Sequence, residues 1–316
     1  MRKRKLGRTG LQVTELSLGT WGLSGDGYGQ IAERDQDEVL DRALTFGINL
    51  FDTADVYGSG AMERKLGERL PVDGSTYVVT KIGTDLDGSP PRKRFDAVYL
   101  GESFKRCQER LQREKLDVVL LHNPSAAAIK SSDAAPFMQQ LVDDGKLTAW
   151  GLSAGDSDSI YAALSRPEKP FVVELAYNVF MTRDVESVQY DLEESEVGIL
   201  ARSVLAHGLL AGYWMPDKSF PRGDHRRDRW TPDQLQRRLT QLQALSVVVG
   251  REIPTKRAAA LRYVLDNRYI SSAVLGPKSP MQLTQLVREA GKAAPYLDPH
   301  TKGRFESRLY ELGVHR

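Results

Sequence analysis

The sequence predicts a single (β/α)8 barrel, and three observations lead to this fold class. Short apolar runs typical of buried strands recur eight times, and stretches with apolar residues at three- and four-residue spacing, typical of helices, lie between them. No repeated module and no low-complexity linker divides the chain, so we expect one domain over residues 1–316. The eight strands are expected at residues 15–19, 49–52, 77–81, 117–121, 149–153, 172–176, 198–202 and 272–275.

Three further segments are expected outside this alternation. Residues 5–6 and 11–13 flank a Gly-Arg-Thr-Gly turn and predict a small β-hairpin ahead of the first barrel strand. Residues 299–313 predict a final helix packed against the barrel. Residues 214–230 read as a long polar loop after the seventh strand, and loops of that length are usually functional or disordered. The charge run within this loop is more often a solvated face than a site.

The composition excludes several classes of protein. The net charge is only +2, from 44 basic and 42 acidic residues, which argues against a general nucleic-acid or membrane surface. No apolar segment follows the basic start of the chain, and no run approaches the ~20 apolar residues of a membrane span, so a soluble cytoplasmic protein is expected. The single cysteine, Cys107, cannot form an internal disulfide and is expected to be an inert, partly buried side chain, and no metal site is expected.

Polar residues end three of the predicted strands. Asp52, Lys81 and His122 close successive apolar runs, and Tyr57 follows Asp52 in a short loop. Each has an ordinary structural explanation by itself: a cap, a lysine that extends to solvent, a core histidine or a rim aromatic. Together they favour a constructed site, because the carboxyl ends of parallel barrel strands share the rim where such folds carry their chemistry.

These four side chains suit proton transfer to an oxygen. A free tyrosine has a pKa of about 10, and a neighbouring ammonium lowers it by favouring the phenolate. Asp52 would hold Lys81, and His122 could donate a hydrogen bond to a substrate oxygen. The phenol of Tyr57 could then protonate an alkoxide that develops from a carbonyl. Because no activated serine or cysteine nucleophile is present, a hydride carrier would have to supply the electrons.

Motifs along nearly the whole chain, in order, resemble the aldo-keto reductase family. They are Leu6–Gly10 with Leu16–Trp21, Gly47–Gly58, Val79–Lys81, Leu120–His122, Gly145–Leu147 with Gly151–Ser153, Glu174–Asn178, Ala201–Gly212 and Gly276–Leu283. The resemblance implies a TIM barrel whose N-terminal hairpin covers the barrel bottom. It also implies an NADP(H)-dependent oxidoreductase that interconverts an aldehyde, ketone or sugar carbonyl with an alcohol. Asp52, Tyr57, Lys81 and His122 would be its catalytic tetrad, with Tyr57 as general acid and base.

The resemblance also implies which residues hold the cofactor and the substrate. The substrate pocket would contain Trp21, Tyr57, His122 and Asn123. Lys278 and Ser279 fit an adenosine 2′-phosphate site, which favours NADP(H) over NAD(H). The full set of implied cofactor contacts is Gly19, Thr20, Trp21, Asp52, Ser153, Glu174, Arg202, Ser203, Leu205, Gly208, Leu209, Gly276, Lys278, Ser279, Gln282 and Gln285.

The chain departs from the family pattern at several of these positions. Ala154 replaces an asparagine, Glu174 replaces a glutamine, and Gln285 with Leu286 replaces a Glu-Asn pair, while Arg202 follows one large branch of the family. We hypothesise that Glu174 pairs with Arg202, whose guanidinium plane could lie over the nicotinamide. A carboxylate there would favour the positively charged oxidised cofactor. A tolerated substitution at position 174 is the alternative.

Two other functions compete with the oxidoreductase. The first is an NADP(H)-binding regulatory or redox-sensing subunit with slow turnover, because the resemblance extends to channel-associated β subunits. The second is a barrel hydrolase that uses Asp52 and His122, but the sequence carries neither a metal cluster nor an activated nucleophile. The physiological substrate, the direction of flux and the oligomeric state are left open.

Overall fold

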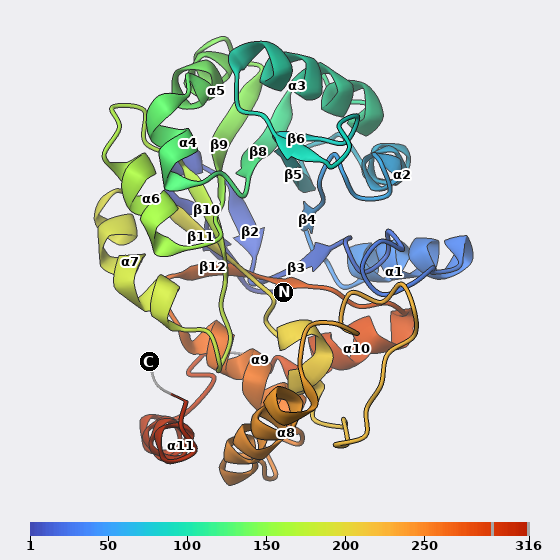
Figure 1. Cartoon of the computed structure of the whole chain (residues 1–316), viewed down its shortest axis with the longest axis vertical. Helices are drawn as coiled ribbons and strands as arrows, with labels where there is room; N and C mark the ends of the chain where they lie inside the picture. Colours follow the sequence, from blue (N-terminus) through green and yellow to red (C-terminus); the bar gives the residue numbers. More distant parts are fainter. Residues whose placement is uncertain (292–293, 315–316) are drawn as a thin grey trace.

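Eight parallel strands form a closed barrel in the computed structural model, which describes residues 1–291 and 294–314. The strands follow the order of the chain around the barrel, and β12 closes it against β3, with Leu275 opposite Leu18 (Figure 1). All eight expected strands are present, with bounds that differ from the prediction by at most two residues. They are β3 Leu16–Gly19, β4 Leu50–Asp52, β5 Tyr77–Ile82, β8 Leu116–His122, β9 Leu147–Ser153, β10 Val172–Ala176, β11 Gly198–Arg202 and β12 Ile270–Leu275.

Helices surround the barrel, and each connection between barrel strands contains at least one (Figure 1). The connection after β11 is the longest and holds η2, the long loop, α8, η3 and α9. The helices are α1 Glu33–Thr45, α2 Ala61–Arg69, α3 Ala97–Leu111, α4 Ala126–Ser131, α5 Ala134–Asp143, α6 Ser157–Leu164, α7 Arg183–Glu194, η2 Ala206–Ala211, α8 Pro232–Gln241, η3 Leu242–Val247, α9 Lys256–Asp266, α10 Pro280–Glu289 and α11 Pro299–Glu311.

The N-terminal hairpin closes the lower end of the barrel. Its strands β1 Lys3–Lys5 and β2 Gln12–Thr14 pair antiparallel and are joined through the short helix η1 Gly7–Thr9. The strands lie further from the turn than the sequence predicted, because Leu6 leaves the hairpin and enters the barrel interior. Leu6 and Val13 are completely buried there, beside inward-pointing residues of the barrel strands.

The predicted C-terminal helix is present as α11, and the predicted long loop, residues 214–230, contains neither helix nor strand. Phe305 of α11 packs edge-on against Tyr263 of α9, with ring centroids 5.7 Å apart. A second small hairpin, β6 Thr84–Asp85 with β7 Arg92–Lys93, lies between β5 and α3 and was not predicted. Cys107 on α3 is completely buried rather than partly buried.

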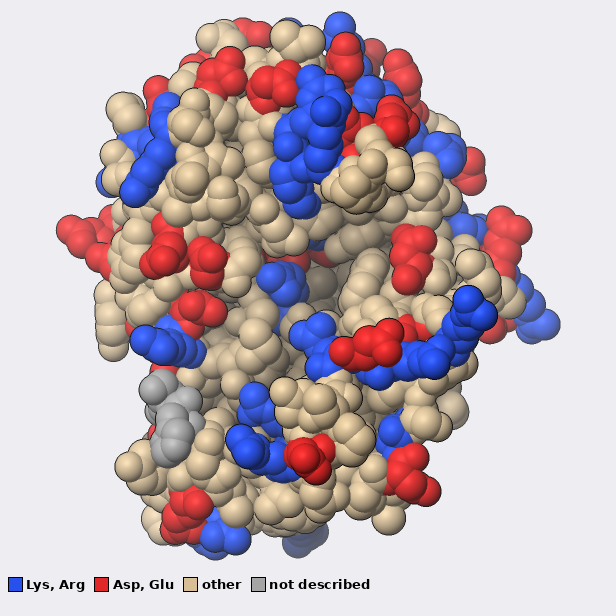
Figure 2. Space-filling model, viewed as in Figure 1, with Lys and Arg blue, Asp and Glu red and all other residues tan. Residues whose placement is uncertain are grey.

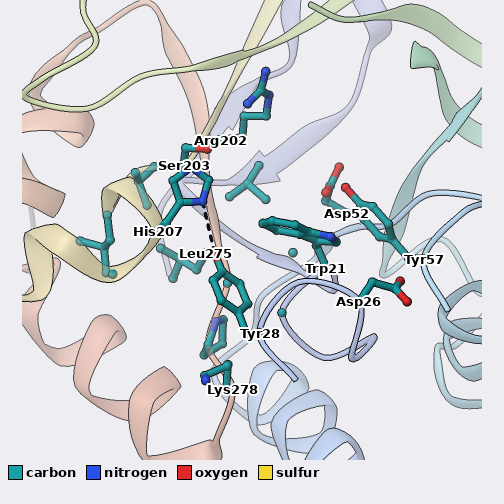
Figure 3. A pocket seen from close by; sticks show the side chains of 18 of the residues that line it. Trp21, Asp26, Tyr28, Asp52, Tyr57, Arg202, Ser203, His207, Leu275 and Lys278 are labelled. Atoms are coloured by element: carbon teal, nitrogen blue, oxygen red, sulfur yellow. Dashed lines mark hydrogen bonds between the residues drawn. The ribbon is translucent and has the colours of Figure 1, made fainter. Parts of the chain in front are cut away.

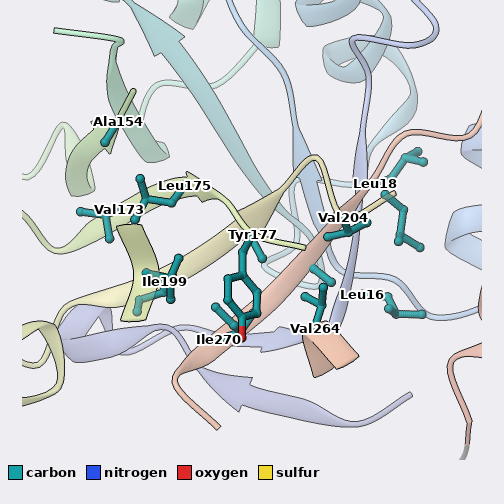
Figure 4. Packing of buried hydrophobic residues seen from close by; sticks show 14 of the residues in the cluster. Leu16, Leu18, Ala154, Val173, Leu175, Tyr177, Ile199, Val204, Val264 and Ile270 are labelled. Atoms are coloured by element: carbon teal, nitrogen blue, oxygen red, sulfur yellow. The ribbon is translucent and has the colours of Figure 1, made fainter. Parts of the chain in front are cut away.

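Side chains alternate between two hydrophobic layers because successive residues of a strand point to opposite faces. In β5, Val78 points outward toward the helices, Val79 points into the barrel and Lys81 follows Val79 inward. Figure 4 shows part of the outer layer, with Val173 of β10, Ile199 of β11, Ile270 of β12 and Val264 of α9. The same alternation turns the last residue of several strands toward the barrel axis.

Candidate active site

Polar side chains from neighbouring strands converge at the carboxyl end of the barrel. The register places His122 of β8 beside Ser153 of β9, and Ser153 beside Glu174 of β10. Asp52 and Arg202 end β4 and β11 at the same rim. These side chains surround the hollow seen near the middle of the face in Figure 2, and Figure 3 shows part of its wall.

Lys81 lies between two buried carboxylates. Its Nζ donates a hydrogen bond to Asp52 Oδ2 at 2.5 Å and one to the Thr53 carbonyl oxygen at 3.0 Å. Nζ also lies 3.1 Å from Glu174 Oε2. The pairing with Asp52 is the one the sequence predicted, whereas the contact with Glu174 was not foreseen. All three side chains are at most 5% exposed, so solvent screens these interactions little.

Burial controls the protonation of Asp52. Desolvation raises its pKa to about 7, and the negative charge of Glu174 contributes to the rise, although Lys81 opposes both effects. The repulsion of Asp52 by Glu174 thus works against its attraction to the ammonium. The Asp52–Lys81 pair is fully charged only above neutrality.

Tyr57 does not have the lowered pKa that the sequence analysis expected. Lys81 Nζ lies 5.4 Å from the centroid of the Tyr57 ring and favours the phenolate. Desolvation is the larger effect, and the charges of Asp52 and Glu174 add to it, so the pKa of Tyr57 is raised. The expectation failed because it counted the ammonium of Lys81 but not the desolvation of the phenol or the charge of Glu174. At neutral pH the phenol carries its proton.

His122 is a neutral imidazole beside this phenol. Burial, followed by the nearby cations Lys93, Lys81 and Arg202, holds its pKa well below the ordinary value. Its ring meets the Tyr57 ring edge-on, with centroids 6.4 Å apart. Nδ1 is buried without a hydrogen-bond partner among the described residues. A neutral imidazole still carries one N–H and can direct it to a substrate oxygen.

The hypothesised pair between Glu174 and Arg202 is present but long. Arg202 Nε lies 3.8 Å from Glu174 Oε1, while Arg202 Nη2 donates to the Ala154 carbonyl oxygen at 3.0 Å. Glu174 is 2% exposed, whereas the side chain of Arg202 is 31% exposed. The guanidinium therefore reaches into the hollow, and the carboxylate lies beneath it.

A cavity of about 720 Å³ extends from these side chains to Lys278 at the start of α10. Fifteen of the residues that the sequence predicted for the site line it. They are Gly19, Trp21, Asp52, Tyr57, His122, Asn123, Ser153, Glu174, Arg202, Ser203, Leu205, Gly208, Gly276, Lys278 and Gln282.

Five predicted site residues do not line the cavity. Lys81 lies behind Asp52, and Leu209 is buried in the outer hydrophobic layer. Ser279 caps the N-terminus of α10, and Gln285 accepts a hydrogen bond from Arg257 at 3.0 Å. Thr20 donates to the Asp52 carbonyl oxygen at 3.0 Å. These four residues, predicted to contact the cofactor, make contacts within the chain, and Lys81 contacts the cavity wall through Asp52.

The structure adds cavity residues that the sequence analysis did not select. Asp26, Tyr28, His207, Arg226 and Arg257 line the wall. Asp26 and Tyr28 lie in the glycine-rich stretch after β3, and His207 and Arg226 lie after β11; loops after barrel strands commonly supply site residues. Their location in loops after barrel strands could have identified them as candidates. Loop residues, however, have no periodicity that shows which side chains point into the cavity.

Two loops meet over one side of the cavity. The His225 amide donates to the Gly27 carbonyl oxygen at 2.9 Å, which joins the long loop to the loop after β3. Arg226 lies 4.6 Å above the Tyr28 ring and pairs with the buried carboxylate of Asp224 at 2.5 Å. Tyr28 also contacts His207 Nδ1 at 3.4 Å, as Figure 3 shows. The sequence analysis favoured solvation for this charge run, but Asp224 is 4% exposed.

The donors around the cavity suit a dinucleotide that carries phosphates. Lys278, Arg226 and Arg257 line one part of the wall, while Ser153, Glu174 and Arg202 line the part near Tyr57. A Cβ atom at Gly276 would meet nothing within 4 Å, so the backbone there faces open space that a ligand can approach. Among residues 1–291 and 294–314, no group of His, Cys, Asp and Glu suits a metal ion. Within the same residues, no helix has the length and hydropathy to span a membrane.

Comparison with known proteins decides the family. The model of the Aldo/keto reductase family matches residues 15–293. The chain belongs to this family. Aldo/keto reductases are oxidoreductases that generally use a nicotinamide cofactor, in agreement with the sequence resemblance.

Individual relatives share the fold of this aldo/keto reductase. A glycerol dehydrogenase from Gluconobacter oxydans is 23% identical, with a TM-score of 0.83 over 99% of this chain and 97% of the other. An aldo-keto reductase from Bacillus halodurans in its holo form is also 23% identical, with a TM-score of 0.79 over 99% and 96%. A Schizosaccharomyces pombe protein named "Putative voltage-gated potassium channel subunit beta" is 29% identical over 94% of this chain and 89% of its own length.

Proposed function

We propose that this protein is an NADP(H)-dependent oxidoreductase that interconverts a small aldehyde or ketone, including sugar carbonyls, with the corresponding alcohol. The observation that carries the proposal is the convergence of Tyr57, His122 and the Asp52–Lys81 pair on one cavity large enough for a dinucleotide. Tyr57 and His122 would act on the substrate, which makes them the catalytic residues, and Asp52 with Lys81 would position and tune the phenol.

The residues nearest Tyr57 would hold the nicotinamide end of NADP(H), and Lys278 with Arg226 would hold the 2′-phosphate end. Ser153 and Glu174 offer polar groups to the carboxamide, and the Arg202 guanidinium lies at the edge of the same space. When bound, the cofactor supplies or accepts the hydride. Lys278 and Arg226 add two positive charges, and phosphate recognition by basic side chains supports a preference for NADP(H) over NAD(H).

Carbonyl reduction requires a proton donor that is still protonated at neutral pH. The raised pKa of Tyr57 keeps the phenol in that form, and the neutral imidazole of His122 can hold the carbonyl oxygen with its N–H. As negative charge develops on this oxygen, Lys81 stabilises the phenolate that Tyr57 becomes. Trp21, Val56 and Leu86 line the adjoining wall and help to exclude water.

The test is titration of the purified protein with NADPH and NADH, followed by tryptophan fluorescence, with a panel of aldehydes added to the same samples. Wild-type protein should bind NADPH more tightly than NADH and oxidise it when an aldehyde is present. Tyr57→Phe should still bind NADPH but lose about 100-fold or more of the turnover, since a general acid typically contributes this much. Equal turnover in Tyr57→Phe would eliminate the proposed proton donor.

A second candidate is a nucleotide-binding regulatory subunit with slow turnover. The relative named as a channel β subunit supports it, as does the covering of the cavity by the two joined loops. Very tight retention of NADPH, together with slow oxidation across the whole aldehyde panel, would favour this function over the enzyme.

A further inference from the structure

Glu174 is a buried acid at a position where the proposed cofactor and the proton-transfer groups meet. It lies on β10 beside Ser153 of β9, lines the cavity and is 2% exposed. One oxygen lies 3.1 Å from Lys81 Nζ, and the other lies 3.8 Å from Arg202 Nε. Lys81 is thus shared by two buried carboxylates, those of Asp52 and Glu174.

The pairing of Glu174 is incomplete. Oε2 lies 3.1 Å from Lys81 Nζ but has no hydrogen-bond partner among the described residues, and the hydrogen bonds of Lys81 run to Asp52 and to the Thr53 carbonyl. Arg202 is held off by its own hydrogen bond to the Ala154 carbonyl. Burying a carboxylate lowers the stability of the folded protein unless the charge is fully paired. A neutral side chain at this position would therefore cost less folding free energy than Glu174. The retained charge therefore calls for a functional explanation.

We propose that Glu174 is a positioning residue that shares Lys81 with Asp52 and places a buried carboxylate beside the nicotinamide site, where it strengthens binding of the oxidised cofactor relative to the reduced one. The inference rests on the proposed function. Alcohol oxidation would need Tyr57 as a phenolate to take the hydroxyl proton, while the oxidised cofactor takes a hydride from the carbon. The oxidised nicotinamide carries a positive charge that the reduced ring lacks, so a buried carboxylate distinguishes the two states.

The same charge acts on the phenol. Glu174 and Asp52 both oppose the ionisation of Tyr57, and Glu174 also raises the pKa of Asp52. Replacing Glu174 by glutamine removes one of these charges while keeping the size of the side chain. The pKa of Tyr57 and that of Asp52 should then both fall, and the pH profile of alcohol oxidation should move to lower pH.

The experiment measures the dissociation constants of NADP⁺ and NADPH for wild-type protein, Glu174→Gln and Glu174→Asp. In Glu174→Gln the ratio of the two constants should shift by about tenfold in favour of NADPH, the effect of one partly screened charge. Glu174→Asp keeps the charge and should keep the wild-type ratio. A purely structural role would weaken both cofactors equally and leave the ratio unchanged, which would overturn the inference.

Glu63→Gln is a matched control. Glu63 is a completely buried carboxylate on α2 that accepts hydrogen bonds from Arg110 and Thr80, outside the cavity. This variant should lose stability without a change in the cofactor ratio. A shift in Glu63→Gln as large as that in Glu174→Gln would mean that any buried carboxylate produces the effect, and the inference would fall.

Wild-type protein gives an independent measurement if Glu174→Gln does not fold. It should bind NADP⁺ at least as tightly as NADPH, and clearly tighter binding of NADPH would refute the inference. Failure of the inference and failure of the proposed function look different. If both cofactors bind but the ratio of their dissociation constants is the same in wild-type protein and Glu174→Gln, only the role of Glu174 is refuted. If neither cofactor binds, the proposed function is refuted and this inference with it.

Discussion

At the scale of single residues, the site is controlled by how completely each charge is removed from water. Burial raises the pKa of Tyr57 and Asp52 and lowers that of His122. All three shifts favour the uncharged form, as desolvation requires. The ammonium of Lys81 remains charged because two carboxylates hold it. The protonation state of the site is therefore set by pairs and clusters and not by the residue types alone.

Asp55 offers a test of this effect on stability. Burial and the charge of Glu63 raise its pKa to about 7, although Arg110 opposes the rise, and its Oδ1 has no hydrogen-bond partner among the described residues. The folded protein holds the proton up to about pH 7, whereas the unfolded chain loses it near pH 4. Ionised Asp55 therefore costs stability progressively as pH rises through this window, and the full penalty is present above pH 7.

Replacing Asp55 by asparagine should remove that penalty. We expect the free energy of unfolding of Asp55→Asn, relative to wild type, to rise by about 1–3 kcal/mol between pH 4 and pH 8. Urea unfolding at a series of pH values measures it. If the free energies of unfolding of Asp55→Asn and wild type differ by the same amount at pH 4 and at pH 8, Asp55 does not titrate between these pH values.

Asp26 is a residue-scale determinant of the substrate. Its Oδ2 accepts a hydrogen bond from the Gly58 amide at 2.7 Å, which places an exposed carboxylate at the cavity beside Tyr57 (Figure 3). A negative charge at the mouth repels anionic substrates. Asp26→Asn should raise kcat/KM for a carboxylated aldehyde by about threefold to fivefold at low salt, with little change for a neutral aldehyde of similar size. An equal gain for both aldehydes would argue against a charge effect.

At the scale of elements, the strands place the site by alternation, and close packing inside the barrel restricts what they can carry. Gly151 of β9 occupies an inward position between Leu120 and the start of β10. A Cβ atom there would lie 1.8 Å from the Val172 carbonyl oxygen, which is backbone and cannot move aside. The glycine is needed for β9 and β10 to pair and so to bring Ser153 beside Glu174.

Gly151→Ala should therefore destabilise the protein by about 3 kcal/mol or more, or prevent soluble expression. Gly155→Ala is the control, because a Cβ atom at Gly155 would meet nothing within 4 Å and its backbone needs no glycine-specific conformation. Thermal unfolding of both variants measures the effect. Similar melting temperatures for the two would contradict the packing argument.

At the scale of the whole molecule, the N-terminal hairpin links the segments that begin the first and last strands of the barrel, β3 and β12. Arg4 pairs with Glu15 at 2.6 Å and donates hydrogen bonds to the carbonyl oxygens of Leu265 and Ile270, at 2.8 and 2.6 Å. Glu15 immediately precedes β3, and Ile270 begins β12, so one side chain joins the segments at the seam where the barrel closes.

Arg4→Ala should lower the free energy of unfolding by about 2–4 kcal/mol, because it leaves the buried Glu15 carboxylate poorly paired. Arg34→Ala removes an exposed helix ion pair with Glu38 and should change stability by less than about 0.5 kcal/mol. Urea unfolding of the two variants measures the contrast. Equal losses would mean that the seam contributes no more than a surface ion pair.

The sequence by itself determined the barrel and the inward-pointing groups of the site. Short apolar runs located all eight strands, and the last residues of three of those runs identified Asp52, Lys81 and His122. These inferences succeeded because strand periodicity is local: the residue type and its place in the run together say which way a side chain points.

Only the tertiary structure decided how those charges meet. The contact of Glu174 with Lys81 crosses from β10 to β5, which are not neighbours in the barrel, and no spacing in the sequence encodes it. The loop residues Asp26 and Tyr28 were missed for the same reason, since irregular backbone has no period. The rise in the pKa of Tyr57 likewise depends on burial and on two carboxylates brought together by folding. Desolvation and long-range electrostatics are properties of the closed barrel, and they exist only once the chain has folded.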